Sequence, residues 1–95
     1  MQIYADRQAL HQIPELQLDL PKTQEYLRQA LSGLSCHVFS PIGSALCAWF
    51  DFGKEKAIAF RADADALPVT EKTKAPYASA YDGAMHACGH DGHMA

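Results

Sequence analysis

The chain opens with a polar-rich stretch in which apolar residues recur at helical spacing. Ile3, Leu10 and Ile13 are spaced to share one face, which predicts a helix over about residues 2–12. Pro14 is expected to end this helix, because the residue before a proline avoids the α region.

A second helix is marked by its ends and by an apolar stripe. Pro21 suits the first turn of a helix, Asp19 is a candidate N-cap, and Gly33 fits the C-terminal end. The stripe lies on one face and consists of Tyr26, Leu27, Ala30, Leu31 and Leu34.

The pattern then changes to one typical of strands. Residues 36–39 predict a short strand, residues 44–52 a longer apolar one, and residues 56–60 a third, reached through a hairpin turn at 53–55. Residues 68–83 are polar, contain prolines and predict a loop. Two helices followed by three strands indicate an α/β fold in which helices pack on part of a mixed sheet.

Composition limits what the chain can bind. Lys and Arg number 8 against 11 Asp and Glu, for a net charge of −3, and the basic residues are scattered, so no nucleic-acid partner is expected. With 95 residues, 48% of them hydrophobic, the chain can form one small core. No apolar run approaches the roughly 20 residues of a membrane span, and the first residues lack the features of a signal peptide.

Cysteine usage points to a reducing compartment, and we expect a cytoplasmic protein. The three cysteines form an odd set without repeated spacing, which argues against a disulfide framework. Cys36 and Cys47 lie in apolar surroundings and are expected in the core. Their separation does not match the paired ligands of a structural zinc domain.

Candidate metal ligands crowd into the last ten residues. Three imidazoles, a thiol and a carboxylate fall within eight positions, separated by small residues: His86, Cys88, His90, Asp91 and His93. This density favours transition-metal binding over a polar loop with surface histidines. A thiolate ligand favours zinc or another borderline ion over magnesium or calcium.

The backbone of this segment decides which ligands share a side. If it is extended, His86, Cys88 and His90 lie on one side at i, i+2 spacing. If a helix starts near His90, then His93 shares its face at i+3. The residues alone leave both arrangements open.

A second candidate site follows the third expected strand. Asp63 and Asp65 are two positions apart, so in an extended chain both side chains point to the same side and can converge on a ligand. Ligands of open α/β sheets collect beyond the carboxyl ends of strands, where this pair falls. The alternative is a solvated pair, with Arg61 as its ion-pair partner.

Two other histidines have simpler explanations. His11 lies shortly before Pro14 and can tie the end of the first helix to a neighbouring element. His37 lies in an expected strand and is interpreted as an outward-facing polar residue.

Three motifs together suggest a family. They are LHQIPE at residues 10–15, RADADALP at 61–68 and the highly specific MHACGHDGH at 85–93. In this order they resemble the metal-dependent amidohydrolase branch of the aminoacylase and carboxypeptidase superfamily. That branch includes hippurate hydrolases, N-acetyldiaminopimelate deacetylases and plant auxin–amino acid conjugate hydrolases.

The resemblance implies a zinc-peptidase-like catalytic domain, of which this chain matches the N-terminal part, ending in a metal-ligand loop. It also implies hydrolysis of N-acyl amino acids, as small-molecule substrates, by two divalent ions, manganese or zinc. Cys88 and His90 match metal ligands of the family. The other motif residues are expected to orient these ligands or line the substrate site: Asp63, Asp65, His86, Asp91 and His93.

The resemblance further implies that residues 1–95 form an incomplete catalytic domain. In the family, the general-base glutamate belongs to a Glu-Glu pair downstream of the last motif, and a second, dimer-forming domain is present. We therefore expect a fragment that contains no catalytic residue of its own and is inactive alone. The alternatives are a small metal-binding or interaction module, which can associate with a separate C-terminal part, and a poorly soluble remnant without function.

Overall fold

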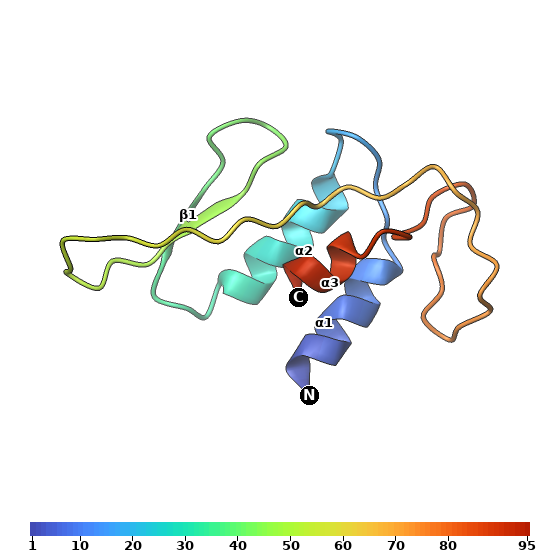
Figure 1. Cartoon of the computed structure of the whole chain (residues 1–95), viewed down its shortest axis with the longest axis horizontal. Coiled ribbons are helices and arrows are strands. Elements are labelled where there is room, and N and C mark those ends of the chain that lie inside the picture. Colours follow the sequence, from blue (N-terminus) through green and yellow to red (C-terminus); the bar gives the residue numbers. More distant parts are fainter.

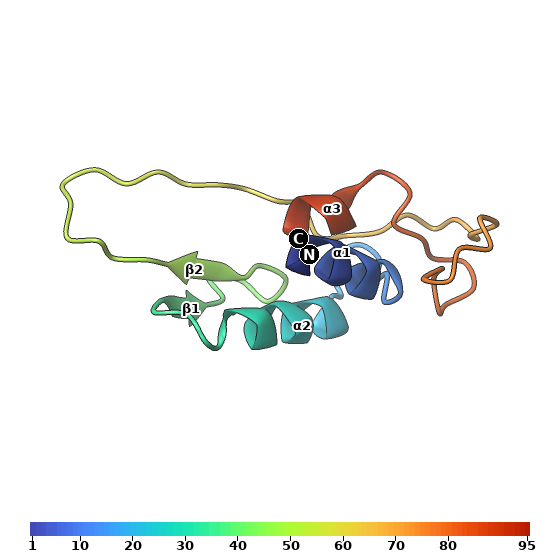
Figure 2. The ribbon, with the colours of Figure 1, turned by 90° about the horizontal axis from the view of Figure 1, so that it is seen from below.

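The computed structural model describes all of residues 1–95 as a helical body with an extended arm. The elements, in chain order, are α1 (Gln2–His11), α2 (Pro21–Leu31), β1 (His37–Phe39), β2 (Cys47–Trp49) and α3 (His90–Met94) (Figure 1). Figure 2 shows α1 between α3 on one side and α2 on the other. The radius of gyration is 14.4 Å, against about 12 Å for a compact chain of this length. The expected α/β fold class is confirmed, with an elongated shape.

Helix α1 forms as predicted, but its apolar face is only partly covered. Leu10 is buried, whereas Ile3 near the start of the helix is exposed. The helix ends at His11, before Pro14, as the proline rule requires. Only the last turn of α1 therefore belongs to the core.

Helix α2 begins at Pro21 as predicted, but the expected N-cap is wrong. The N-cap residue is Leu20, which has no side-chain acceptor, and Asp19 does not cap the helix. Instead, the Glu15 carboxylate accepts hydrogen bonds from the backbone N–H groups of Lys22 (3.2 Å) and Thr23 (2.7 Å). A carboxylate at this end also interacts favourably with the helix dipole.

The sheet has two strands, and the predicted third strand is absent. Strands β1 and β2 pair antiparallel, with Val38 opposite Ala48. The turn at Gly53 is present, with φ of 68° and its N–H bonded to Asp51 Oδ1. Residues 56–60 follow it without strand pairing, and no backbone–backbone hydrogen bond involves residues 50–64. A strand needs a neighbouring backbone, and none lies beside this segment.

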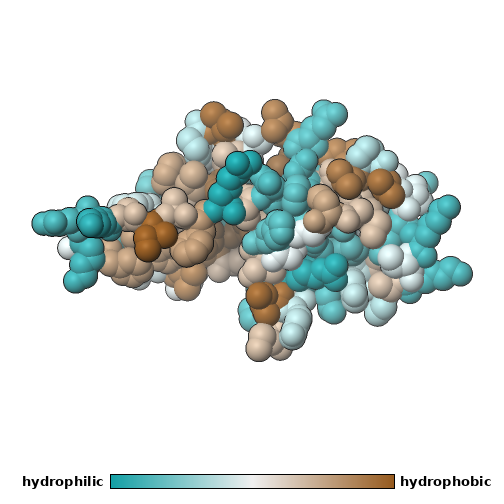
Figure 3. Space-filling view, viewed as in Figure 1, coloured by the Kyte–Doolittle hydropathy of each residue, from teal (hydrophilic) through white to brown (hydrophobic).

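We call residues 50–64 the arm; it runs outward from β2 and returns towards α3 (Figure 2). Three of its large apolar side chains are mostly exposed: Phe52 by 78%, Ile58 by 84% and Phe60 by 96%. Figure 3 shows apolar surface gathered at this end of the molecule, behind a hydrophilic tip. The expected exposure of an apolar face is therefore confirmed.

The small core contains an unusual share of polar side chains. Its buried apolar residues are Leu10, Leu20, Ala66 and Ala84, and its buried polar ones are His11, Thr23, His86 and Asp91. Isolated bridges pair Leu16 with Ala66 and Leu67 with Met85, which brings the segments of the last two motifs together. The site thus lies where these segments meet the end of α1.

The cysteines do not lie where the sequence predicts. Cys36 and Cys47 are half-buried and not in the core, because the hairpin that carries them lies at the exposed end of the molecule. All three cysteines are free thiols. None of the helices has the length and apolar character needed to cross a membrane.

Candidate metal centre

The segment that carries the predicted ligands folds as a tight turn followed by a short helix. Gly89 has φ of 95°, in the left-handed region that favours glycine, and it joins exposed Cys88 to the start of α3 at His90. His93 lies one turn further on, with its ring centroid 5.7 Å from that of His90. Of the two arrangements left open by the sequence, the structure has the helical one.

Both aspartates of the second motif lie beside the His90 ring. Nδ1 of His90 is 2.8 Å from the main-chain oxygen of Asp65 and 3.1 Å from its Oδ1, and Nε2 is 4.0 Å from Oδ2 of Asp63. A carbonyl oxygen can only accept, so Nδ1 carries a proton and donates it. In the neutral ring the lone pair then lies on Nε2, the arrangement typical of a metal-binding histidine.

Asp63 also has the partner that the simpler alternative predicted. Its Oδ1 lies 2.8 Å from the guanidinium of Arg61, and both side chains are largely exposed. Such an exposed ion pair contributes little to stability. Asp63 is therefore free to change partner at little cost.

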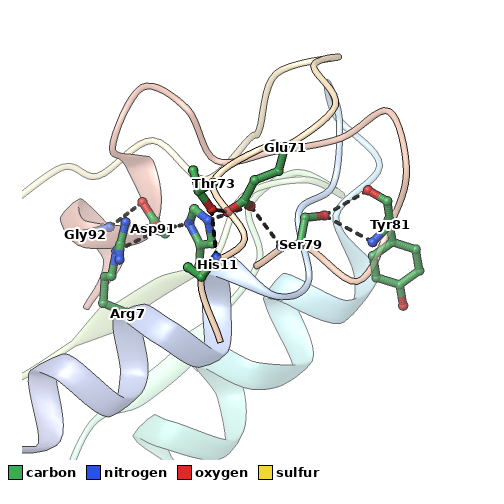
Figure 4. Close-up of polar contacts among 9 residues, drawn as sticks. Arg7, His11, Glu71, Thr73, Ser79, Tyr81, Asp91 and Gly92 are labelled. Atoms are coloured by element: carbon green, nitrogen blue, oxygen red, sulfur yellow. Dashed lines mark hydrogen bonds and ion pairs between the residues drawn. The ribbon is translucent and has the colours of Figure 1, made fainter. Parts of the chain in front are cut away.

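Asp91 lies next to His90 in the chain but is completely buried. Its Oδ2 accepts from His11 Nδ1 at 2.7 Å and from Arg7 Nε at 2.9 Å, and its Oδ1 accepts from the backbone N–H of Gly92 at 3.0 Å (Figure 4). These bonds hold α3 against α1. The expected role of His11, to tie the end of the first helix to a neighbouring element, is confirmed.

The other nitrogen of His11 bonds to Glu71 (Figure 4), which belongs to the loop of residues 68–83, here called the long loop. The distance from Nε2 to Oε1 is 2.8 Å. A hydrogen bond from the Thr73 hydroxyl, supported by the Ser79 N–H and by His11, holds the pKa of Glu71 below its ordinary value. Glu71 is therefore an ionised acceptor at neutral pH. The His11 ring thus lies between two carboxylates, those of Glu71 and Asp91.

His86 is buried without a hydrogen-bond partner at either ring nitrogen. Burial lowers its pKa, so the ring is neutral at physiological pH. It lies near His11, with the ring centroids 6.5 Å apart. Both rings belong to the wall of a cavity of about 420 Å³, whose other polar lining includes Arg7, Glu71, Tyr77 and Cys88.

The structure divides the predicted site residues into two groups. His90 has Asp63, Asp65 and His93 around it, while His86 and Asp91 lie towards His11. No group of three or more His, Cys, Asp or Glu side chains in the chain is arranged to hold a metal ion. The metal role of Cys88 and His90 stays a prediction.

Sequence reasoning missed Arg7, Glu15 and Glu71. Glu71 and Asp91 lie 60 and 80 positions from His11 along the chain. No local pattern signals contacts at such separations. The one signal in the sequence for these contacts was that His11, which bonds both Glu71 and Asp91, lies within the first motif.

Comparison with known proteins identifies the class. The sequence profile of Peptidase family M20/M25/M40 matches residues 59–95, which include both aspartates and the ligand segment. An uncharacterized hydrolase of Staphylococcus aureus is 42% identical over 87 residues, which cover 92% of this chain and 23% of the relative. One of Staphylococcus haemolyticus is 44% identical over the same coverage. The chain is therefore similar to proteins of the M20 peptidase family, and it spans about a quarter of the length of these curated relatives.

Solved structures agree with this assignment. A provisionally assigned aminohydrolase from methicillin-resistant S. aureus matches 97% of this chain with a TM-score of 0.92 and 39% identity, over 25% of its own length. A dinuclear metal-binding peptidase of the M20 family from Bacillus subtilis matches 95% with a TM-score of 0.83 and 36% identity, over 26% of its length. The resemblance inferred from the three motifs is confirmed.

Proposed function

We propose that this chain supplies part of the metal site of a di-metal hydrolase that cleaves the amide bond of N-acyl amino acids. The observation that carries the proposal is His90, whose Nδ1 donates to Asp65 so that the lone pair of Nε2 is free for a metal ion, two positions along the chain from exposed Cys88. The similarity to a dinuclear metal-binding peptidase supports two ions. The choice of substrate class rests on the motif resemblance.

The donor set fits a divalent transition-metal ion. A thiolate and an imidazole are ligands that zinc accepts readily, and manganese is the alternative from the family resemblance. Cys88 and His90 would hold the ion as a half-site, because a tetrahedral zinc site needs four ligands. When bound, the ion supplies Lewis-acid polarisation of the scissile carbonyl.

The chain's own residues prepare this half-site. Asp65 fixes the His90 tautomer through main-chain and side-chain oxygens, and Asp63 places negative charge 4.0 Å from Nε2. Gly89 sets the turn between the two ligands. A ligand held in one tautomer and orientation loses less entropy when it binds an ion.

The arm favours a second property, association with a polypeptide that carries the remainder of the domain. Its backbone is unpaired and its apolar side chains are exposed, as in a strand without neighbours. The three free thiols are in keeping with a cytoplasmic location, which is part of the same proposal.

A chimera tests the proposed function. Residues 1–95 replace the matching quarter of the B. subtilis peptidase, and the product is assayed for bound metal and for hydrolysis of N-acetyl and N-benzoyl amino acids. We expect two divalent ions and turnover, with both reduced by Cys88→Ser and by His90→Ala. His37→Ala, at an exposed histidine outside the site, is the matched control.

Two results would contradict the proposal. One is a folded chimera that keeps its metal content after Cys88→Ser and His90→Ala. The other is hydrolysis of unmodified peptides with no turnover of N-acyl amino acids. The 95-residue chain alone is expected to show no turnover, so measurable turnover by it would contradict the half-site.

A further inference from the structure

The polar cluster around Asp91 places an unusual number of donors on one buried carboxylate. Arg7 Nε, His11 Nδ1 and the Gly92 N–H lie 2.9, 2.7 and 3.0 Å from its oxygens. The Asp91 side chain is 1% exposed and that of Arg7 is 37% exposed, so the cluster is closed on the His11 side and open on the Arg7 side. Each donor therefore limits the position of the first turn of α3.

The cluster also reaches the long loop. His11 bonds Glu71 at 2.8 Å, and Glu71 in turn accepts from the Ser79 N–H at 2.8 Å and from the Thr73 hydroxyl. Both carboxylates of the cluster, those of Asp91 and Glu71, thus face a ring nitrogen of the same histidine. Two segments distant in sequence, the long loop and α3, are therefore bound to a single side chain of α1.

Stability alone does not require such a cluster. Apolar side chains of similar volume generally serve a core as well as a buried ion pair does, whereas hydrogen bonds restrict geometry more narrowly. The position that is restricted here is next to a predicted metal ligand. Asp91 is joined by a peptide bond to His90, and the Gly89 turn joins His90 to Cys88.

We propose that Arg7, His11 and Glu71 are positioning residues for the metal half-site, which act through Asp91 to fix the turn from Cys88 to His90. The inference rests on the proposed function in that it assumes the turn binds metal. It extends the proposal to side chains that lie outside the ligand segment. No hydrogen bond or ion pair joins any of the three to Cys88 or His90.

A pair of substitutions at His11 separates positioning from bulk stability. The side-chain nitrogen of asparagine is as many bonds from Cβ as Nδ1 of histidine, and that of glutamine as many as Nε2. His11→Asn therefore keeps the donor to Asp91 and loses the one to Glu71, while His11→Gln does the reverse. Both remove one buried hydrogen bond, so similar losses of thermal stability are expected.

The first readout is Co²⁺ affinity in a Cys36→Ser, Cys47→Ser background, followed by the thiolate-to-cobalt absorption of Cys88. His11→Gln should weaken Co²⁺ binding about 10- to 100-fold, the usual effect of losing a partner that orients a ligand. His11→Asn should stay within about 3-fold of the parent. Equal affinities for the two variants, or a greater loss in His11→Asn, would overturn the proposal.

The second readout needs no metal. The His93 amide donates to the Gly89 carbonyl at 3.1 Å, so its hydrogen exchange reports the integrity of the turn. Exchange should accelerate in His11→Gln and stay near the parental rate in His11→Asn. If the parent binds no Co²⁺, the metal half-site itself has failed, and this exchange alone decides whether the cluster positions the turn.

A milder variant covers the case in which His11→Gln does not fold. Arg7→Met keeps an apolar side chain but removes the guanidinium, whose Cζ lies 5.3 Å from the centroid of the Tyr77 ring, and with it the bond to Asp91. We expect a several-fold loss of Co²⁺ affinity and faster exchange at His93. Parental values for both would overturn the proposal.

Discussion

The two ends of this molecule differ in the interactions that hold them together. At one end, α1, α3 and the long loop are joined by buried hydrogen bonds centred on His11 and Asp91. At the other, the arm carries Ile58 and Phe60 into solvent without one backbone–backbone hydrogen bond. The first end is complete within the chain, whereas the second has the exposure of a strand without its neighbours.

The difference shows which interactions a chain can satisfy with its own residues. A side-chain cluster needs only its few partners, and here all of them lie within residues 7–92. A sheet needs a neighbouring backbone along its whole length, and the relatives that match this chain are about four times longer. The hydrogen bonds of the cluster beside the candidate metal site are therefore complete within this chain, whereas the backbone pairing of the sheet is not.

The largest expected effect comes from removing the centre of the polar cluster. Asp91→Ala leaves His11 and Arg7 without their buried acceptor, which should cost about 3–5 kcal/mol of unfolding free energy. Urea unfolding followed by circular dichroism measures this. An unchanged midpoint would show that the cluster does not hold α3 to α1.

A smaller effect is expected at the cap of α2. Glu15→Ala removes the acceptor of two helix N–H groups and should cost about 1–2 kcal/mol. Glu25→Ala, on the exposed surface of the same helix, is the matched control and should change stability by less than about 0.5 kcal/mol. Equal losses of stability in the two variants would show that the Glu15 carboxylate does not cap α2.

The next effect depends on pH. The pKa of His86 is lowered below its ordinary value of 6.5, so the unfolded chain takes up a proton there before the folded one does. Stability from this group is therefore full above about pH 6.5 and falls as the pH decreases towards the folded pKa. His86→Phe should be close to neutral at pH 8 and stabilising by about 1 kcal/mol at pH 5.

Unfolding of the parent and of His86→Phe in metal-free buffer at the two pH values checks this prediction. The informative quantity is the difference between the variants, since other groups titrate in both. A difference that does not change between pH 8 and pH 5 would show that His86 is not held neutral by burial.

The smallest effect on stability is expected in the arm. Phe60→Ser should change the unfolding free energy by less than about 0.5 kcal/mol, because the side chain is already in solvent. It should nevertheless reduce self-association, which sedimentation velocity measures over a range of concentrations. A parent that is monodisperse at all concentrations would contradict the expected poor solubility.

The sequence predicted those parts of the fold that local signals determine. Pro21 marked the start of α2, Pro14 the end of α1, and Gly53 a turn, because proline and glycine act through their own backbone. The prediction of a third strand was wrong because strand pairing depends on more than local sequence. Residues 56–60 have a strand pattern, but pairing depends on a partner that lies elsewhere.

The candidate site shows the same division. Its motif residues could be identified from type and spacing, and the ambiguity between extended and helical backbone at His90 was visible in advance. The cap by Glu15 was not predicted because the acceptor lies outside the helix, eight positions before Thr23, and the bond from His11 to Glu71 was not predicted because 60 positions separate the two residues. Tertiary contacts decided them.

The most direct test of the account is the metal content of the purified 95-residue chain after equilibrium dialysis against Zn²⁺. The account predicts one ion per chain, lost in both Cys88→Ser and His90→Ala and retained in His37→Ala. A parent chain that retains no Zn²⁺, or a site that survives the loss of either ligand, would contradict it.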